Sequence, residues 1–329
     1  MPLIKVNNLK IYFHTDRGVV RAVDGVDFSI EKEKTLGVVG ESGCGKSMTA
    51  RAILKLIQMP PGRIETGEIL YHRNKEIIDL AKLNPKGKEM RSIRGKEIAM
   101  IFQEPMTSLN PLYTIGNQIS ETINLHERLP RKEARQKAIE MLKAVGIPSP
   151  EHRINEYPHQ LSGGMRQRAM IAMALSCNPS LLIADEPTTA LDVTIQAQVM
   201  DLMNHLREDF RAAIMFITHD LGVIASIADD VIVMYLGRII ESAPVRAIFN
   251  RPRHPYTQGL IKSIPLLTSA SRKRLIPIKG SVPNLLKTPI GCGFESRCRQ
   301  SLEICKMCVP LLTEVAPGHR VACWLYAET

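Results

Sequence analysis

The sequence has few aromatic residues, no long hydrophobic run, no internal repeat and no low-complexity segment. Aromatics make up 5% of the 329 residues and there is one tryptophan, whereas 44% of residues are hydrophobic and 23% are charged. No apolar run approaches the roughly 18 residues that cross a bilayer, and the first ten residues are too polar for a signal-peptide core. We therefore expect a globular, cytoplasmic protein with one large domain, or a large domain plus a small one.

Net positive charge and a late cluster of cysteines distinguish the composition. The formal charge is +10, which fits either a solvated basic surface or an acidic partner such as lipid headgroups or nucleic acid. The charge alone does not choose between them. Five of the seven cysteines lie between Cys292 and Cys323. In a reducing compartment such a cluster favours a metal or iron–sulfur site over disulfides.

Up to about residue 240, strand-like runs alternate with helical patterns. Apolar runs that alternate or continue predict strands, and apolar residues three and four apart predict helices. Expected strands cover residues 4–13, 26–30, 35–39, 67–71, 98–102, 180–184, 213–218 and 231–236, and expected helices cover 47–58, 131–145, 165–176 and 195–210. This alternation predicts an α/β protein with a mostly parallel sheet.

Two segments differ from this alternation. Residues from about 105 to 162 are mostly helical in pattern, which predicts a helical insert in the α/β core. From residue 241 onward prolines recur and the cysteines follow them. We interpret residues 241–329 as a small appended domain.

Residues 40–47 have the sequence Gly-Glu-Ser-Gly-Cys-Gly-Lys-Ser, which fits the phosphate loop pattern. The pattern lies between a predicted strand and a predicted helix, as a phosphate loop requires. A glycine-rich turn lets successive backbone N–H groups point at a polyphosphate. We expect Lys46 to reach the β- and γ-phosphates and Ser47 to bind Mg²⁺. Gly40 and Gly45 are the two required glycines, and Cys44 is best interpreted as a small space-filling residue.

An apolar strand ends in two carboxylates at Asp185 and Glu186. Ligands bind at the carboxyl ends of strands in open α/β sheets, so the pair is expected beside the phosphate loop. Asp185 is the candidate to hold Mg²⁺, directly or through water. Glu186 is the candidate general base that polarises the attacking water.

Two more polar residues follow predicted strands. Gln103 comes after the strand at 98–102 and suits a contact to Mg²⁺ or to the attacking water. His219 comes after the strand at 213–218 and suits a γ-phosphate contact. Taken alone, Gln103 is equally compatible with a surface glutamine, and a lone histidine is more often structural.

A second anion site is predicted at residues 161–165, Leu-Ser-Gly-Gly-Met. Ser162, Gly163 and Gly164 precede a predicted helix, and a helix N-terminus attracts anions. The chain therefore has two anion sites and one phosphate loop, and the helical insert separates them. We infer that one protomer does not bring both sites to the same phosphate.

The set of motifs resembles ATP-binding cassette (ABC) proteins over about residues 3–240. The resemblance rests on Leu-Ser-Gly-Gly-Met-Arg-Gln at 161–167, and it implies a P-loop NTPase core with an antiparallel β subdomain. It also implies a cassette domain at 1–240, with its helical insert at about 105–162, and a C-terminal regulatory or iron–sulfur domain at 241–329. Residues 190–192, Ala-Leu-Asp, match the family's loop that joins two facing sites.

The resemblance assigns further contacts to ATP. Two cassettes of this family face each other head to tail, so Ser162, Gly163 and Gly164 of one chain contact the γ-phosphate held by the other. The phosphate loop of this chain contributes Gly40, Glu41, Ser42, Gly43, Cys44, Gly45, Lys46, Ser47 and the following Met48. Phe13 lies where the family stacks an aromatic ring on adenine, with Tyr12 or a plain core position as alternatives.

The C-terminal part resembles the ATPase subunits of dipeptide and oligopeptide importers. The matching strings are Arg-His-Pro-Tyr-Thr at 253–257 and Gly-Cys-Gly-Phe-Glu-Ser-Arg-Cys at 291–298. They imply a cytoplasmic motor on the inner face of the cell membrane that does not bind nucleic acid. The implied partners are a second ABC ATPase, two permease subunits and, indirectly, an extracytoplasmic peptide-binding protein. The resemblance suggests that the second ATPase is a paralogue, and a second copy of this chain is the alternative.

The importer resemblance also implies a [4Fe–4S] cluster on Cys292, Cys298, Cys305 and Cys323. Cys308 departs from that pattern and creates a Cys-x-x-Cys that suits zinc, so zinc remains the alternative. We expect the bound group to be structural.

Other functions are compatible with parts of the sequence. A cassette ATPase that acts on nucleic acid, in DNA repair or translation, would need long heptad arms or two ATP sites in one chain, and the sequence has neither. An importer for another cargo, such as nickel, remains open. A module without turnover is disfavoured because Gln103, Glu186 and His219 are all present.

Overall fold

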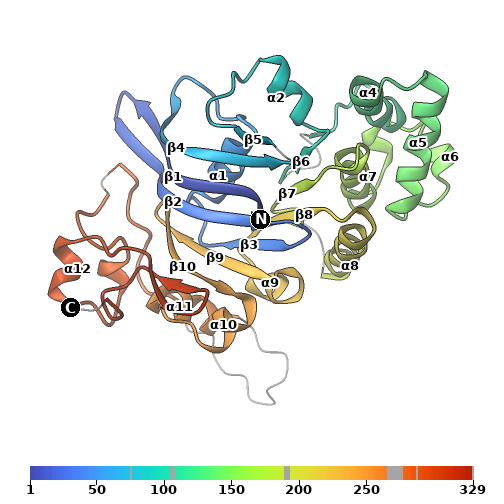
Figure 1. Cartoon of the computed structure of the whole chain (residues 1–329). Helices are drawn as coiled ribbons and strands as arrows, with labels where there is room; N and C mark the ends of the chain where they lie inside the picture. Colours follow the sequence, from blue (N-terminus) through green and yellow to red (C-terminus); the bar gives the residue numbers. More distant parts are fainter. Residues whose placement is uncertain (75, 104–107, 189–192, 265–276, 287, 328–329) are drawn as a thin grey trace, which may run out of the picture. The chain divides into compact units, whose positions relative to one another are not determined.

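The computed structural model describes residues 1–74, 76–103, 108–188, 193–264, 277–286 and 288–327 (Figure 1). Contacts divide the chain into two units. Unit 1 contains Met1, Glu31–Lys34 and Leu83–Ile217, and unit 2 contains Pro2–Ile30, Thr35–Lys82 and Thr218–Thr329. The helical insert expected at 105–162 falls in unit 1, and the domain boundary expected after residue 240 falls inside a strand of unit 2.

Unit 1 is built on the parallel strands β6 (Ile98–Ile101), β7 (Leu181–Asp185) and β8 (Ala213–Thr218), which pair in that order. Every residue of β7 and β8 is buried. Parallel strands covered on both faces need continuous apolar sequence rather than alternation, which explains the runs at these positions. The order of pairing aligns the carboxyl ends of the three strands along one edge.

The helices of unit 1 include the expected insert. They are α2 (Lys88–Ile93), α4 (Ile115–Glu127), α5 (Arg131–Ala144), α6 (Pro150–Arg153), the 3₁₀ turn η1 (Pro158–Gln160), α7 (Gly163–Leu175) and α8 (Val193–Phe210). Helices α4, α5 and α7 pack on one another, and α7 also packs on β6. Among all helices of the described residues, none is both long and apolar enough to cross a membrane.

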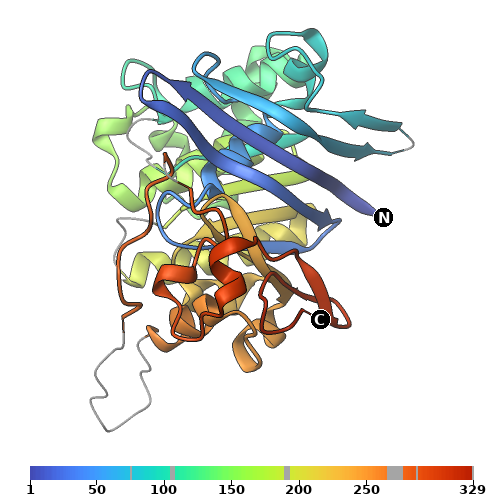
Figure 2. The same ribbon diagram turned by 90° about the vertical axis from the view of Figure 1, so that its left-hand side faces the viewer.

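Unit 2 contains an antiparallel sheet in the order β2-β1-β4-β5. Its strands are β1 (Pro2–Thr15), β2 (Gly18–Glu31), β4 (Gly62–Arg73) and β5 (Glu76–Asp79), and Figure 2 shows the long β1 and β2 running side by side. Strand β1 pairs with β4 from Ile4 opposite Tyr71 to Phe13 opposite Gly62. The antiparallel β subdomain that the resemblance implied is thereby confirmed.

A second sheet in unit 2 carries the phosphate loop. Its strands, in order of pairing, are β3 (Thr35–Val39), β9 (Asp230–Tyr235), β10 (Arg238–Pro244), β12 (His319–Val321) and β11 (Thr313–Ala316). Strands β3 and β9 are parallel, and the remaining pairs are antiparallel. The α/β fold is confirmed, and β10, β12 and β11 give this sheet an antiparallel edge.

The helices of unit 2 are short. They are α1 (Lys46–Ile53), α9 (Leu221–Ile227), α10 (Val245–Asn250), α11 (Pro255–Lys262), the 3₁₀ turn η2 (Glu295–Arg297) and α12 (Glu303–Met307). Helix α1 ends at Ile53 instead of the expected Gln58. The backbone of Lys55 turns to a positive φ of 52°, a conformation that stops a right-handed helix before the prolines are reached.

A buried carboxylate ties the C-terminal residues to the second sheet of unit 2. Glu241 on β10 is 0% exposed, and its two oxygens accept bonds from the backbone N–H groups of Arg253 (2.6 Å) and His254 (2.9 Å). Oε1 also lies 2.8 Å from Nε2 of His319 on β12. The Glu241 carboxylate thus binds two backbone N–H groups at the start of α11 and one histidine ring on β12. These bonds fix the start of α11 against the sheet.

Replacing Glu241 by alanine is expected to destabilise the chain by about 3–5 kcal/mol, because buried N–H groups lose their acceptor. Chemical denaturation of the full chain measures this. Glu303→Ala is the matched control, since Glu303 is 84% exposed and pairs with Lys306 at the surface, and we expect a change below about 0.5 kcal/mol. Equal stabilities for the two variants would contradict the structural importance of Glu241.

Candidate nucleotide-binding site

In unit 2, residues 40–47 connect β3 to α1, as the phosphate loop pattern requires. Gly45 is the N-cap of α1, has a φ of 103°, and no side chain caps the helix. Ser42 and Gly43 are exposed at the surface of the loop. The N-terminus of α1 therefore has no capping side chain, as is typical of helix N-termini that bind anions.

The side chain of Lys46 lies within the loop. It is 4% exposed, and its Nζ donates to the carbonyl oxygens of Gly40 (2.7 Å) and Glu41 (3.2 Å). A buried ammonium is stable here because loop oxygens replace its hydration. The lysine predicted to contact the β- and γ-phosphates is thus held inside the loop that would surround them.

Two positions of the loop accept only glycine. A Cβ on Gly40 would lie 2.3 Å from the carbonyl oxygen of Met234, and a Cβ on Gly45 would lie 2.4 Å from that of Ala22. Cys44, which is 2% exposed, fills the space between them, and burial raises the pKa of its thiol. Cys44 therefore packs as a small apolar residue.

The two adenine candidates on β1 have different surroundings. The hydroxyl of Tyr12 donates to Asp24 (2.6 Å), and Arg21 lies 5.7 Å from the centre of its ring. Burial, followed by the hydrogen bond to Asp24, raises the pKa of Tyr12 to about 12. Phe13 points to the opposite face of the strand and packs beside Gly62. Since Tyr12 is already bonded, Phe13 remains the better candidate for adenine.

Asp24 also pairs with Arg238 across unit 2. Nη2 of Arg238 lies 2.6 Å from Oδ2 of Asp24. Burial alone would raise the pKa of Asp24, but the hydrogen bond from Tyr12 and the charge of Arg238 outweigh burial and hold the pKa below its usual value. The backbone N–H of Asp24 donates to Gly237, whose own N–H donates to Cys44 in the phosphate loop. The turn at Gly237 therefore links β2 to the phosphate loop through backbone hydrogen bonds.

His219 lies between β8 and α9. It is exposed, and the next residue, Asp220, caps α9 by accepting the N–H of Gly222 at 2.7 Å. Because of this cap, α9 begins at Leu221, and His219 lies in the short turn between the strand and the helix. The sequence-based placement of His219 at the carboxyl end of a strand is correct.

The acidic residues belong to unit 1. Asp185 is the last residue of β7 and is 2% exposed, and Glu186 follows it. The N–H of Glu186 donates to Ile217 (2.9 Å), and its backbone has a φ of 49°, which is strained for a residue with a side chain. Nε2 of Gln103 donates to Oε2 of Glu186 at 3.0 Å. Gln103 and Glu186, both sequence-based candidates to contact the attacking water, are thus in contact.

The predicted second anion site is the N-terminus of α7 in unit 1. Ser162 is exposed and accepts the N–H of Met165 at 3.3 Å, and no atom approaches within 4 Å of a Cβ on Gly163. The helix therefore starts at Gly163, two residues earlier than expected, because Ser162 caps it. The exposed Gly163 makes this end of the helix accessible to a ligand.

Gln167 is the last residue of the motif at 161–167, and no separate role was predicted for it. It is 1% exposed, and its Nε2 donates to the carbonyl oxygen of Pro187 at 2.5 Å. This bond joins α7 to the segment that follows Asp185 and Glu186. The signal available in the sequence was a polar residue on the buried face of a predicted helix. The residues expected to join two facing sites, 190–192, lie outside the described part of the chain.

The four cysteines predicted to hold a cluster lie in one region of unit 2. Burial, together with the nearby thiols of Cys292, Cys298 and Cys305, raises the pKa of Cys323 to about 11. Cys308 is exposed and takes no part in this group. Within the described ranges, no three or more Cys, His, Asp or Glu side chains are arranged to hold a metal ion.

A strand, a glycine loop and a helix, together with a carboxylate at the end of a buried parallel strand, define a P-loop nucleotide-binding protein. Family models agree with this class. Residues 23–189 match the model described as ABC transporter, and residues 240–305 match the model described as oligopeptide/dipeptide transporter, C-terminal region. The chain belongs to the ABC transporter family.

Relatives match almost the whole chain. The oligopeptide transport ATP-binding protein AppD of Bacillus subtilis is 52% identical over 326 residues, which cover 99% of this chain and 97% of AppD. OppD of the same organism, also an oligopeptide transport ATP-binding protein, is 50% identical over 98% of this chain and 88% of its own length. The solved dimer of the bacterial ABC transporter cassette MJ0796 is 28% identical with a TM-score of 0.65, covering 74% of this chain and 99% of that chain.

Gly45→Ala is expected to weaken ATP binding by on the order of tenfold or more, because strain of about 1–3 kcal/mol falls on the loop itself. Titration of the full chain with a fluorescent ATP analogue measures this. Gly318→Ala is the matched control, since Gly318 also has a positive φ (70°) but open space around its Cβ position and lies far along the chain. Unchanged affinity in Gly45→Ala would contradict the assignment of the loop.

Proposed function

We propose that the chain is the ATP-hydrolysing subunit that powers import of dipeptides or oligopeptides through a membrane ABC transporter. The observation that carries this proposal is the match to oligopeptide transport ATP-binding proteins over 98–99% of the chain, including its C-terminal region. No observation favours a nucleic-acid-acting cassette. The cargo, whether dipeptide, oligopeptide or another ligand such as nickel, is chosen by the partners.

The proposed chemistry uses the phosphate loop of unit 2 and the polar residues at the strand ends of unit 1. The phosphate loop, with Lys46, binds the β- and γ-phosphates of ATP, and Phe13 stacks on adenine. Mg²⁺ is held by Ser47 and Asp185, with Gln103 as a further ligand or as a contact to the water. Oxygen and nitrogen donors of this kind match the needs of a hard divalent cation and its phosphates.

Hydrolysis then needs a base and an aligned water. The oxygen of water attacks the γ-phosphorus, the bond from the γ-phosphorus to the β–γ bridging oxygen breaks, and ADP and phosphate are the products. Glu186 accepts the proton of the attacking water, and His219 contacts the γ-phosphate. The bond from Gln103 supports this assignment, because it orients the carboxylate of Glu186.

The proposed assembly has two ATPase subunits and two permease subunits at the inner face of the membrane. Ser162, Gly163 and Gly164 of one ATPase contact the γ-phosphate bound by its partner, a paralogue or a second copy. The exposure of Ser162 and Gly163 supports this role, since residues that act on another chain must be accessible. ATP closes the pair and hydrolysis reopens it, and an extracytoplasmic peptide-binding protein supplies the cargo.

Glu186→Gln should leave ATP affinity within about twofold of the wild type and reduce kcat by about 10²–10⁴, because the amide cannot accept the proton. Phosphate release by the assembled transporter, with ATP binding measured in parallel, tests this. Glu208→Gln on the exposed face of α8 is the control and should retain normal turnover. Normal hydrolysis by Glu186→Gln would refute its role as the base.

We further propose that Cys292, Cys298, Cys305 and Cys323 hold a [4Fe–4S] cluster of structural function. Four thiolates are a suitable donor set for such a cluster, and the mutual influence of these thiols on the pKa of Cys323 supports their gathering. When bound, the cluster would link the segments that carry the four cysteines. The exposed Cys308 would remain outside the site.

Anaerobically purified protein is expected to contain about four iron atoms per chain, with a broad visible absorbance band. Cys305→Ser should lose the iron and the band, whereas Cys308→Ser, the matched control, should retain both. Metal analysis and absorbance spectroscopy provide these readouts independently of activity. Zinc without iron, especially if Cys308→Ser releases it, would establish the alternative zinc site.

A further inference from the structure

A buried arginine of the C-terminal region contacts the phosphate loop. Arg297 lies on η2, its side chain is 4% exposed, and its guanidinium pairs with both carboxylate oxygens of Glu41. Nη1 donates to Oε2 at 2.6 Å, and Nη2 donates to Oε1 at 3.0 Å. Such a two-point pair fixes orientation as well as position, because the planar guanidinium matches the carboxylate.

The guanidinium of Arg297 is itself held on its other sides. Nε donates to the carbonyl oxygen of Lys279 (3.1 Å), and Nη1 also donates to the hydroxyl of Tyr235 (3.2 Å). The rings of Tyr235 and Phe294 lie 5.8 Å from its central carbon. The hydrogen bonds to Glu41 raise the pKa of Arg297 above its usual value, so it stays charged at any relevant pH. Few alternative positions are open to this side chain.

The backbone of Glu41 is held by a second C-terminal residue. Its N–H donates to the hydroxyl of Tyr256 at 2.9 Å. Tyr256 is fully buried on α11, where the neutral His254 caps the helix by accepting the N–H of Tyr256, since burial lowers the pKa of His254 to about 3. Arg297 and Tyr256 therefore bind the side chain and the main chain, respectively, of one phosphate-loop residue.

The backbone of Glu41 contacts the side chain of Lys46. The carbonyl oxygens of Gly40 and Glu41 are the acceptors of the Lys46 ammonium, so the position of Glu41 determines where Lys46 is held. A loop with three glycines has many conformations when it is free. Ordering it before ATP arrives removes part of the entropy loss of binding.

We propose that Arg297 and Tyr256 are positioning residues that hold the phosphate loop in its ATP-binding form through Glu41. The C-terminal region thereby sets the nucleotide affinity of the cassette, although neither residue touches the nucleotide. The proposal depends on residues 40–47 being the phosphate loop, which Gly45→Ala tests separately. An effect of Gly45→Ala without an effect at Arg297 would refute only this proposal.

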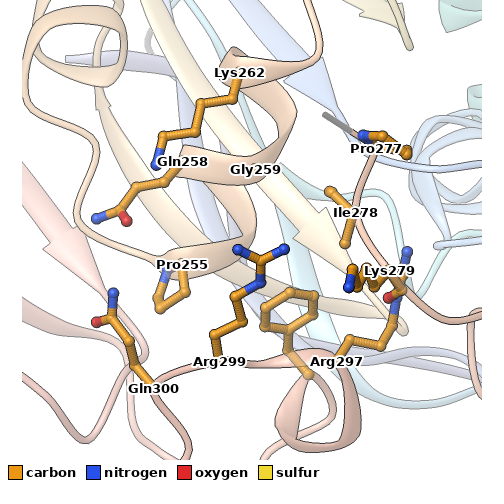
Figure 3. Close-up of a pocket in the computed structure, with 11 residues that line it drawn as sticks. Pro255, Gln258, Gly259, Lys262, Pro277, Ile278, Lys279, Arg297, Arg299 and Gln300 are labelled. Carbon is orange, nitrogen blue, oxygen red and sulfur yellow. The ribbon is translucent and has the colours of Figure 1, made fainter. Parts of the chain in front are cut away.

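Arg299 offers a matched control for Arg297. Figure 3 shows both arginines lining a pocket of about 130 Å³ together with Gln258, Lys262 and Lys279. Arg299 is exposed, and among the described contacts Glu41 pairs with Arg297 and not with Arg299. Replacing either residue removes one positive charge from the same pocket, so Arg299→Ala controls for the loss of charge.

The experiment measures the dissociation constant of an ATP analogue for the full chain, and KM and kcat for the assembled transporter. Arg297→Ala should weaken binding and raise KM by on the order of tenfold, with kcat changed less than about threefold. Arg297→Lys should recover part of the affinity, since it keeps the charge but not the two-point pair. Tyr256→Phe should give a smaller loss, and Arg299→Ala should have no effect.

A double-variant cycle separates positioning from general stability. Glu41→Gln breaks the charge pair from the loop side and leaves the C-terminal region intact, so it decides the question even if Arg297→Ala does not fold. If Arg297 acts through Glu41, the double variant binds ATP no more weakly than the weaker single variant. Additive losses, or wild-type affinity in folded Arg297→Ala or Glu41→Gln, would overturn the proposal.

Discussion

Close approach of backbone to backbone beneath the phosphate loop is the constraint on which the nucleotide site depends. Gly40 and Gly45 lie so near the carbonyl oxygens of Met234 and Ala22 that a single methyl group would collide with them. The loop can therefore occupy only one place between strands β2 and β9. The uncapped start of α1 and the enclosed ammonium of Lys46 both follow from that placement.

The residues of unit 1 that we propose for catalysis are also fixed by local contacts. Glu186 holds a backbone conformation that is unfavourable for its side chain, and a hydrogen bond to Ile217 keeps it there. Gln167 then joins α7, which begins with the exposed signature residues, to Pro187. One helix thus begins at the exposed Ser162 and Gly163 and is bonded to the segment that follows Asp185 and Glu186.

The C-terminal residues of unit 2 are bound to the cassette by carboxylates rather than by apolar contacts alone. Glu241 accepts N–H groups that begin α11, and Glu41 pairs with Arg297 on η2. Both carboxylates are matched by several donors, which offsets the penalty for removing charge from water. The turn with Arg297 also lies between Cys292 and Cys298, so the proposed cluster and the phosphate loop share one short structural element.

The phosphate loop, the strands that lead to Asp185 and His219, and the helices between residues 105 and 162 could be predicted from the sequence, because these depend on local periodicity and turn chemistry. The sequence pattern placed the end of α1 too late, since the turn at Lys55 has no marker in its residue type. The pairing of Gln103 with Glu186, 83 residues apart, and of Glu41 with Arg297, 256 residues apart, could not be predicted from the sequence. Such contacts arise from how whole elements pack, and no local pattern encodes which distant polar groups that packing brings together.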